Sequence, residues 1–125
     1  MSLILIVEDN EKNLKLVRDV LQFKGYRTLE AVTGTEGVRL AREEKPDLVL
    51  MDIQLPDIDG ITALGRIRAD PLTQKMPVIA VSASVMPDDQ QRIVASGFDA
   101  YVTKPINVKS FIETIEKFIG KPPGK

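Results

Sequence analysis

The chain has 125 residues, of which 43% are apolar and 28% charged, and its net charge is -1; these values predict one globular domain. The balanced charge supplies no cationic field for nucleic acid or anionic lipid, and no apolar run approaches the ~20 residues that a membrane-spanning helix needs. The absence of cysteine and histidine excludes disulfides, thiol chemistry and histidine-based catalysis. The missing cysteine and the lack of a basic leader at Met1 fit a cytoplasmic protein.

The chain begins with the pattern of a buried strand followed by an amphipathic helix. Residues 3–7 are a continuous apolar run, which predicts a strand that ends at Glu8-Asp9. Asn10 can cap the next helix, and Gly25 can end it. The apolar stripe of this helix is expected to contain Leu14, Leu16, Val17, Val20, Leu21 and Phe23.

The next two strands differ in how apolar they are. Residues 27–31 alternate apolar and polar residues, which predicts a weaker strand. Residues 33–36 match a capping box and open a second helix, which runs to about Glu44 before Pro46. Residues 48–51 form another buried strand, and this strand ends at Asp52.

Three helices and two strands are predicted for the remaining chain. A loop through Asp59-Gly60 leads to a third helix, which Asp70-Pro71 breaks. Residues 78–81 predict a buried strand ending at Ser82, and Pro87 suits the first turn of a fourth helix that runs to about Gly97. A short strand at 100–102 precedes Thr103-Lys104-Pro105, and Asn107 can cap a last helix that ends near Ile119.

These elements alternate strictly between strand and helix five times. Such alternation predicts an α/β fold with a parallel sheet and helices on both faces. The first, third and fourth strands are wholly apolar and belong in the middle, which gives the order 2-1-3-4-5 of the flavodoxin-like, doubly wound class. We expect one domain over residues 1–119, a short flexible tail over 120–125, and no output domain.

Polar residues follow four of the five predicted strands. Glu8 and Asp9 follow the first strand, Asp52 the third, Ser82 the fourth and Lys104 the fifth. Ligands of such sheets bind outside the carboxyl ends of the strands, at the switch between the first and third strands. Each residue alone could be an ordinary turn, cap or exposed loop residue, but chance does not readily place all five at one edge.

This group of residues suits phosphoryl transfer to a carboxylate. Three converging carboxylates repel one another, and Mg²⁺ (or Mn²⁺) bound by Glu8, Asp9 and Asp52 would compensate them. With Lys104 added, the charges sum to zero before a phosphoryl group enters. Asp52 would be the nucleophile, Lys104 would neutralise charge on the transferring oxygens, and Ser82 would donate a hydrogen bond to the attached group.

At these positions the chain resembles the receiver domain of two-component response regulators, in particular the stand-alone DivK-like and CheY-like type. The resemblance covers nearly the whole chain and is carried by Val7-Glu8-Asp9-Asn10, Met51-Asp52-Ile53-Gln54-Leu55-Pro56, Asp59-Gly60, Ser82-Ala83 and Lys104-Pro105. It implies that Asp52 is the phosphorylated aspartate, that the backbone carbonyl of Gln54 binds the metal, and that Ser82 and Tyr101 are switch residues. It also implies a cis bond before Pro105.

The pair Glu8-Asp9 departs from the more frequent Asp-Asp of the family, so Glu8 would reach the metal through water. Gln54 and Ser84 lie beside the acceptor and would tune hydrolysis of the phosphoaspartate.

The resemblance further implies a bacterial phosphorelay protein that catalyses only its own phosphorylation and dephosphorylation. The phosphoryl group would come from a histidine kinase or a histidine phosphotransfer protein. A downstream protein would bind the face formed by the fourth helix, fifth strand and fifth helix, with no role for nucleic acid or membrane. We expect a monomer or weak dimer. Candidates for that face are Val85, Met86, Gln90, Ile93, Tyr101 and Lys109.

Three other functions would use some of the same residues. A haloacid-dehalogenase-type phosphatase would carry a second acid two residues after the nucleophile, where this chain has Gln54. A flavodoxin-like cofactor binder would need a phosphate-binding loop after the first strand, where Glu8 and Asp9 would repel phosphate. A docking receiver that is never phosphorylated would not need the full set of phosphorylation residues, all of which are present.

Overall fold

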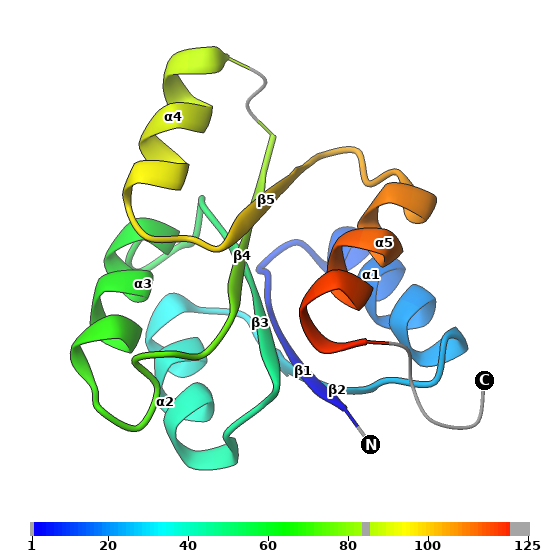
Figure 1. Cartoon of the computed structure of the whole chain (residues 1–125), viewed down its shortest axis with the longest axis horizontal. Helices are drawn as coiled ribbons and strands as arrows, with labels where there is room; N and C mark the ends of the chain where they lie inside the picture. The colour runs from blue at the N-terminus through cyan, green and yellow to red at the C-terminus, as the bar shows by residue number, and fades with distance from the viewer. Residues whose placement is uncertain (1, 84–85, 121–125) are drawn as a thin grey trace.

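The computed structural model describes residues 2–83 and 86–120, and these fold as alternating strands and helices (Figure 1). The strands are β1 (Leu3–Val7), β2 (Arg27–Ala31), β3 (Leu48–Asp52), β4 (Val78–Ser82) and β5 (Ala100–Thr103). The helices are α1 (Glu11–Phe23), α2 (Gly34–Glu44), α3 (Gly60–Ala69), α4 (Pro87–Ala95) and α5 (Val108–Ile119). The predicted tail falls mostly on residues 121–125, which lie outside the described residues.

The strands form one parallel sheet in the order β2-β1-β3-β4-β5, as predicted. Every residue of β3 and β4 is buried, whereas β2 and β5 consist mainly of half-buried residues. A strand buried on both faces must be apolar throughout, which is why composition alone placed β2 and β5 at the edges.

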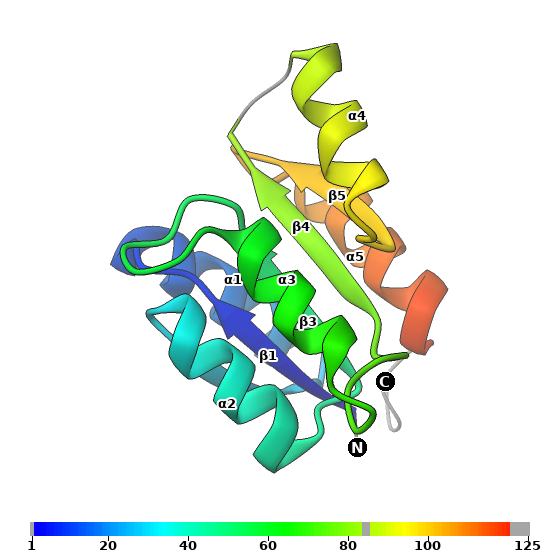
Figure 2. The same ribbon diagram turned by 90° about the vertical axis from the view of Figure 1, so that its left-hand side faces the viewer.

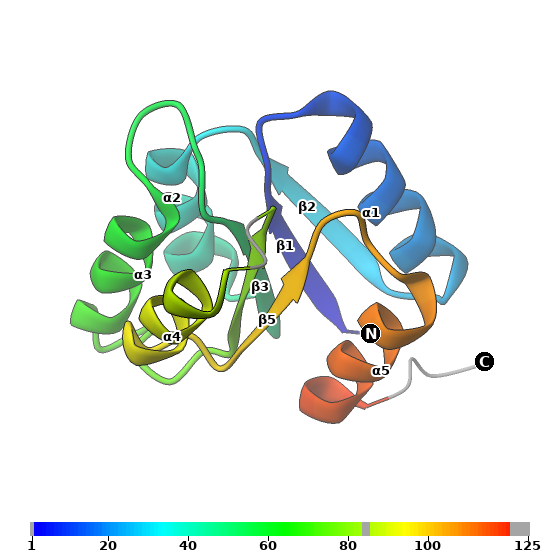
Figure 3. The ribbon, with the colours of Figure 1, turned by 90° about the horizontal axis from the view of Figure 1, so that it is seen from above.

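Two apolar cores hold the sheet between two layers of helices (Figures 2 and 3). One face, with Ile4, Leu50 and Ile79, packs against α1 and α5. The other face, with Leu5 and Met51, packs against α2, α3 and α4. None of the helices in the described part of the chain is long and apolar enough to cross a membrane.

The predicted helix starts are confirmed by their hydrogen bonds. The Asn10 side chain accepts from the amides of Lys12 and Asn13 at 3.0 and 3.1 Å. Thr33 Oγ1 accepts from the Glu36 amide at 3.1 Å, and Asn107 Oδ1 accepts from the Ser110 amide at 3.0 Å. These caps satisfy first-turn N–H groups that have no partner within the helix.

The predicted apolar stripe of α1 was too wide. Leu14, Val17 and Leu21 are buried, but the side chains of Leu16 and Phe23 are 43% and 79% exposed. Each of these two residues lies two positions after a buried leucine, which at 100° per residue turns it to the opposite side of the helix.

The parallel arrangement brings the carboxyl ends of all five strands to one edge of the sheet, onto which Figure 3 looks. The segments that follow β1, β3, β4 and β5 meet there. This edge carries the polar residues that the sequence singles out.

Candidate functional site

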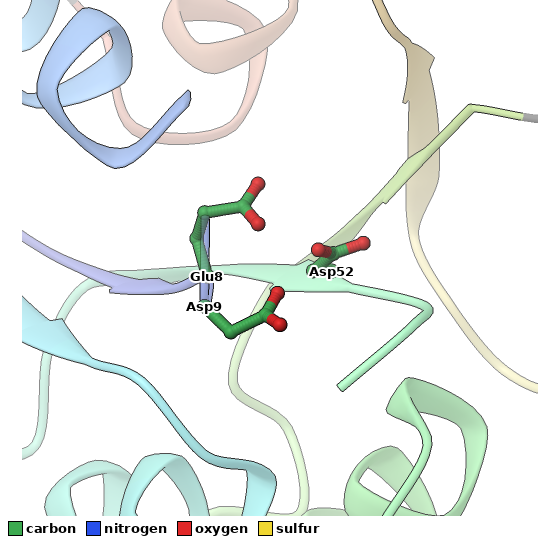
Figure 4. Close-up of side chains that lie close together, drawn as sticks. All are labelled: Glu8, Asp9 and Asp52. Carbon is green, nitrogen blue, oxygen red and sulfur yellow. The ribbon is translucent and has the colours of Figure 1, made fainter. Parts of the chain in front are cut away.

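Three carboxylates meet at this edge (Figure 4). Asp52 is the last residue of β3, and Glu8 and Asp9 follow β1, whose Val7 is paired in register with Met51. One oxygen from each of Glu8, Asp9 and Asp52 lies within 4.8 Å of the others. Glu8 and Asp52 are buried, whereas Asp9 is exposed. The predicted convergence of the three acids is therefore what the fold produces.

Lys104 reaches two of these acids at once. Its Nζ lies 2.9 Å from Glu8 Oε1 and 3.1 Å from Asp52 Oδ2. The backbone holds Lys104 in place, because its amide donates to the Ser82 carbonyl at 2.9 Å. The bond between Lys104 and Pro105 is cis, as the resemblance implied. A single ammonium thus balances part of the negative charge of the buried pair.

A cavity of about 110 Å³ opens beside Asp52. The predicted residues Gln54, Ser82 and Lys104 line it, and the Gln54 amide donates to Asp52 Oδ1 at 3.2 Å. Asp89 and Arg92 of α4 line the same cavity. Neither residue is predicted from the sequence, because the position of a strand end does not indicate which face the following helix turns toward the site.

The charge state of the site depends on burial. Burial raises the pKa of Glu8 to about 7, and contact with the Asp52 carboxylate acts in the same direction while Lys104 opposes it. Burial alone would lower the pKa of Lys104, but its hydrogen bond to Glu8 and the charge of Asp52 outweigh this effect and raise it. Lys104 therefore stays charged at neutral pH, whereas Glu8 sits close to its titration point.

Glu8 makes the stability of the metal-free protein depend on pH. Between pH 4.5 and about 7, folded Glu8 holds a proton that the unfolded chain has lost. Stability should therefore fall as pH rises through this window, by up to on the order of 1.4 kcal/mol per pH unit. Urea unfolding in EDTA from pH 5 to 8 measures this slope, and Glu8→Gln should remove it. Parallel profiles for the two proteins would show that folded Glu8 is already ionised.

The three carboxylates fit a hard divalent cation. Magnesium takes oxygen ligands at 2.0–2.1 Å, so opposite ligands are about 4.2 Å apart. The carboxylate oxygens of Glu8, Asp9 and Asp52 already lie within 4.8 Å of one another, so small adjustments would suffice. When Glu8 is ionised, Glu8 and Asp52 with one lysine between them carry a net negative charge that a cation would compensate.

The predicted output face is only partly as expected. The Tyr101 hydroxyl of β5 donates to Gln90 Oε1 of α4 at 2.9 Å, beside a hollow of about 430 Å³. Met86 is exposed and so is Lys109. Ile93 was wrongly assigned to this face: it is only 1% exposed, because α4 turns it into the core against the sheet. Val85 and Ser84 lie outside the described residues.

Comparison with known proteins agrees with this geometry. The sequence-family model of the response regulator receiver domain matches residues 4–116 of this chain. The polar-differentiation response regulators DivK of Brucella anthropi and Brucella ovis are each 47% identical over 117 residues, which are 94% of this chain and 95% of each relative. The chain thus matches relatives of nearly its own length.

Solved receiver domains share the fold. One belongs to the sensor histidine kinase PA1611 of Pseudomonas aeruginosa PAO1 and carries magnesium in its active-site cleft; it has a TM-score of 0.89 and 32% identity, over 96% of this chain and 98% of that one. A response regulator from Chloroflexus aurantiacus has a TM-score of 0.91 and 26% identity, over the same shares of the two chains. The chain therefore belongs to the receiver domains of response regulators, which are signalling switches of two-component systems rather than classical enzymes.

Proposed function

We propose that this receiver domain is a phospho-acceptor switch in which Asp52 takes a phosphoryl group from a phosphohistidine of another protein. The observation that carries the proposal is the position of Asp52: its carboxylate is buried at a strand end, touches Lys104, and borders a cavity of about 110 Å³. An acceptor needs this combination of a nucleophile, a fixed cation and space for the incoming group.

The transfer forms one bond to phosphorus and breaks another. An Asp52 oxygen attacks phosphorus, the P–N bond of phosphohistidine breaks, and the imidazole nitrogen leaves with the electron pair and takes up a proton. Lys104 neutralises charge that develops on the phosphoryl oxygens, and the Ser82 hydroxyl donates a hydrogen bond to the attached group. When bound by Glu8, Asp9, Asp52 and the Gln54 carbonyl, Mg²⁺ or Mn²⁺ supplies further charge neutralisation at the same oxygens.

These 125 residues cannot supply the phosphohistidine themselves, because they contain no histidine. A histidine kinase or a histidine phosphotransfer protein supplies the phosphohistidine in this proposal. The phosphorylated form then acts by binding a downstream protein through the face of α4, β5 and α5, where the Tyr101 hydroxyl meets Gln90.

Tyr101 is the proposed link between Asp52 and the face of α4, β5 and α5. Phosphorylation draws Ser82 toward the new oxygens, and Tyr101 exchanges its hydrogen bond with Gln90 for a more buried position. Tyr101→Ala should leave phosphorylation intact and reduce the change in downstream binding that phosphorylation causes. Calorimetric titration of the target with and without beryllofluoride measures that change. An undiminished change in the variant would exclude the link.

Intact mass spectrometry tests the proposal directly. The folded protein is incubated with acetyl phosphate in the presence of Mg²⁺ or of EDTA. One added phosphoryl mass with Mg²⁺ and none with EDTA is the expected result. No adduct in either condition, together with no spectral response to beryllofluoride, would leave a receiver that only docks.

A further inference from the structure

The loop between β3 and α3, residues 53–59, is tied to the beginning of α2 by one side chain. Asp57 Oδ1 accepts from the Gly34 amide at 2.8 Å, and Oδ2 accepts from the Thr35 amide at 2.9 Å and from the Thr35 hydroxyl. The helix also has a local cap, Thr33, whose hydroxyl oxygen accepts a hydrogen bond from the Glu36 amide. Asp57 is thus a second, tertiary cap, which joins the loop to a helix more than twenty residues away in sequence.

Packing holds the same loop closely on α2. Gly34 is buried beneath Ile58, and a Cβ there would lie 2.5 Å from Ile58 Cγ1 and 3.2 Å from its carbonyl oxygen. The contact leaves no room for a side chain at position 34. The loop therefore rests directly on the first turn of α2, and the views in Figures 2 and 3 place it there.

The other end of the loop is fixed to β3. The Gly60 amide donates to the Ile53 carbonyl at 2.8 Å, and the Gln54 amide donates to Asp52 Oδ1 at 3.2 Å. Gln54 consequently lies between two attachments, the acceptor strand on one side and Asp57 on the other. Movement of the Asp57 end would be transmitted to the Gln54 backbone through only two intervening residues.

The Asp57 attachment persists over a wide pH range. The Thr35 hydroxyl, followed by the backbone amides of the helix start, holds the pKa of the Asp57 carboxyl well below its usual range. The positive end of the α2 dipole favours the same charged form. The other polar side chains at this helix start are those of the N-cap Thr33 and of Glu36, of which only Glu36 is acidic.

We propose that Asp57 is a positioning residue, which holds the loop so that the Gln54 carbonyl is presented to the bound metal beside Asp52. The role rests on the function proposed above, since it presumes a divalent cation at Glu8, Asp9 and Asp52. Magnesium requires near-octahedral geometry at 2.0–2.1 Å, so a small displacement of one ligand weakens binding. Residues that orient metal ligands from outside the coordination sphere typically change affinity by about 10- to 100-fold when replaced.

The test compares Asp57→Ala with Thr33→Ala. Each variant removes a side chain that accepts hydrogen bonds from first-turn N–H groups of α2, but only Asp57 also holds the loop. Titration with MgCl₂, followed by the amide resonances of Ile53 and Gln54 in two-dimensional NMR, gives the dissociation constant of each protein. We expect both variants to unfold at lower urea concentration, and only Asp57→Ala to raise the Mg²⁺ dissociation constant, by about tenfold. Asp57→Asn, which keeps one acceptor oxygen, should restore part of the affinity.

Three results would count against this role. Wild-type affinity in Asp57→Ala would overturn it. An equal rise in Thr33→Ala would assign the effect to loss of helix stability instead of loop position. Failure of the wild-type protein itself to bind Mg²⁺ would overturn the proposed function, and the role of Asp57 with it.

Discussion

Asp52→Ala is expected to abolish the phosphoryl adduct that acetyl phosphate and Mg²⁺ produce on the wild-type protein. Among the three clustered acids, Asp52 is the one that both lines the cavity of about 110 Å³ and touches Lys104. Glu8 also touches Lys104 but does not line that cavity, and Asp9 does neither. Asp89 also lines the cavity but forms no ion pair with Lys104 among the described residues, so loss of Asp52 removes the carboxylate that is placed for attack on phosphorus and the expected effect is complete.

The matched control is Asp59→Ala. Asp59 is an exposed aspartate seven residues later, and its side chain caps α3 by accepting from the Thr62 amide at 2.7 Å. This variant should lose about 1 kcal/mol of stability, the usual cost of a lost cap, and should retain the adduct. Intact mass and circular dichroism of the three proteins decide the matter. A full adduct on folded Asp52→Ala would move the acceptor to another residue.

Asp52→Ala should also lower the pKa of Glu8. Asp52 is one reason that the pKa of Glu8 is raised, after burial itself. Without Asp52, Lys104 has a single acidic partner, so the pKa of Glu8 should fall and its titration should move to lower pH. A backbone NMR titration of Glu8 in both proteins measures this shift. Asp52 and Glu8 are thus coupled to each other electrostatically, with Lys104 between them.

Sequence reasoning predicted the meeting of Glu8, Asp9, Asp52, Ser82 and Lys104 because that meeting is a property of topology. Parallel strands end at one edge, and the apolar or mixed composition of each strand fixes its place in the sheet. Once the order 2-1-3-4-5 follows from composition, residues that end four different strands must be neighbours. Their meeting at this edge does not depend on the conformation of any side chain.

Side-chain direction is what the sequence could not supply. The ion pair between Lys104 and Glu8 depends on how both side chains extend after their strands end. The burial of Ile93 and the position of Arg92 at the cavity depend on how α4 crosses the sheet. The link from Asp57 to Gly34 and Thr35 joins a loop to the first turn of α2, and the separation of the two along the chain gives no local signal. Each requires tertiary packing to be known first.

Gly60→Ala should destabilise the protein by more than about 3 kcal/mol, a large part of the 5–15 kcal/mol typical of a domain. Gly60 is buried at the first position of α3, and a Cβ there would overlap the Asp52 carbonyl oxygen and lie 2.9 Å from Ile53 Cα. Both of these atoms belong to backbone that β3 and its hydrogen bonds hold in place, so neither can move aside as a side chain would.

Gly65→Ala in the same helix is the matched control. A Cβ at Gly65 meets nothing within 4 Å, so the replacement should stabilise the protein by about 0.5–1 kcal/mol through helix propensity. Urea unfolding of both variants, with the slope checked for two-state behaviour, gives the two free energies. Because the Gly60 amide also closes the loop onto the Ile53 carbonyl, Gly60→Ala should weaken Mg²⁺ binding as well, whereas Gly65→Ala should not. Wild-type stability and Mg²⁺ affinity in Gly60→Ala would mean that the loop can lift from β3 without cost, and that the close approach of α3 to Asp52 does not shape the site.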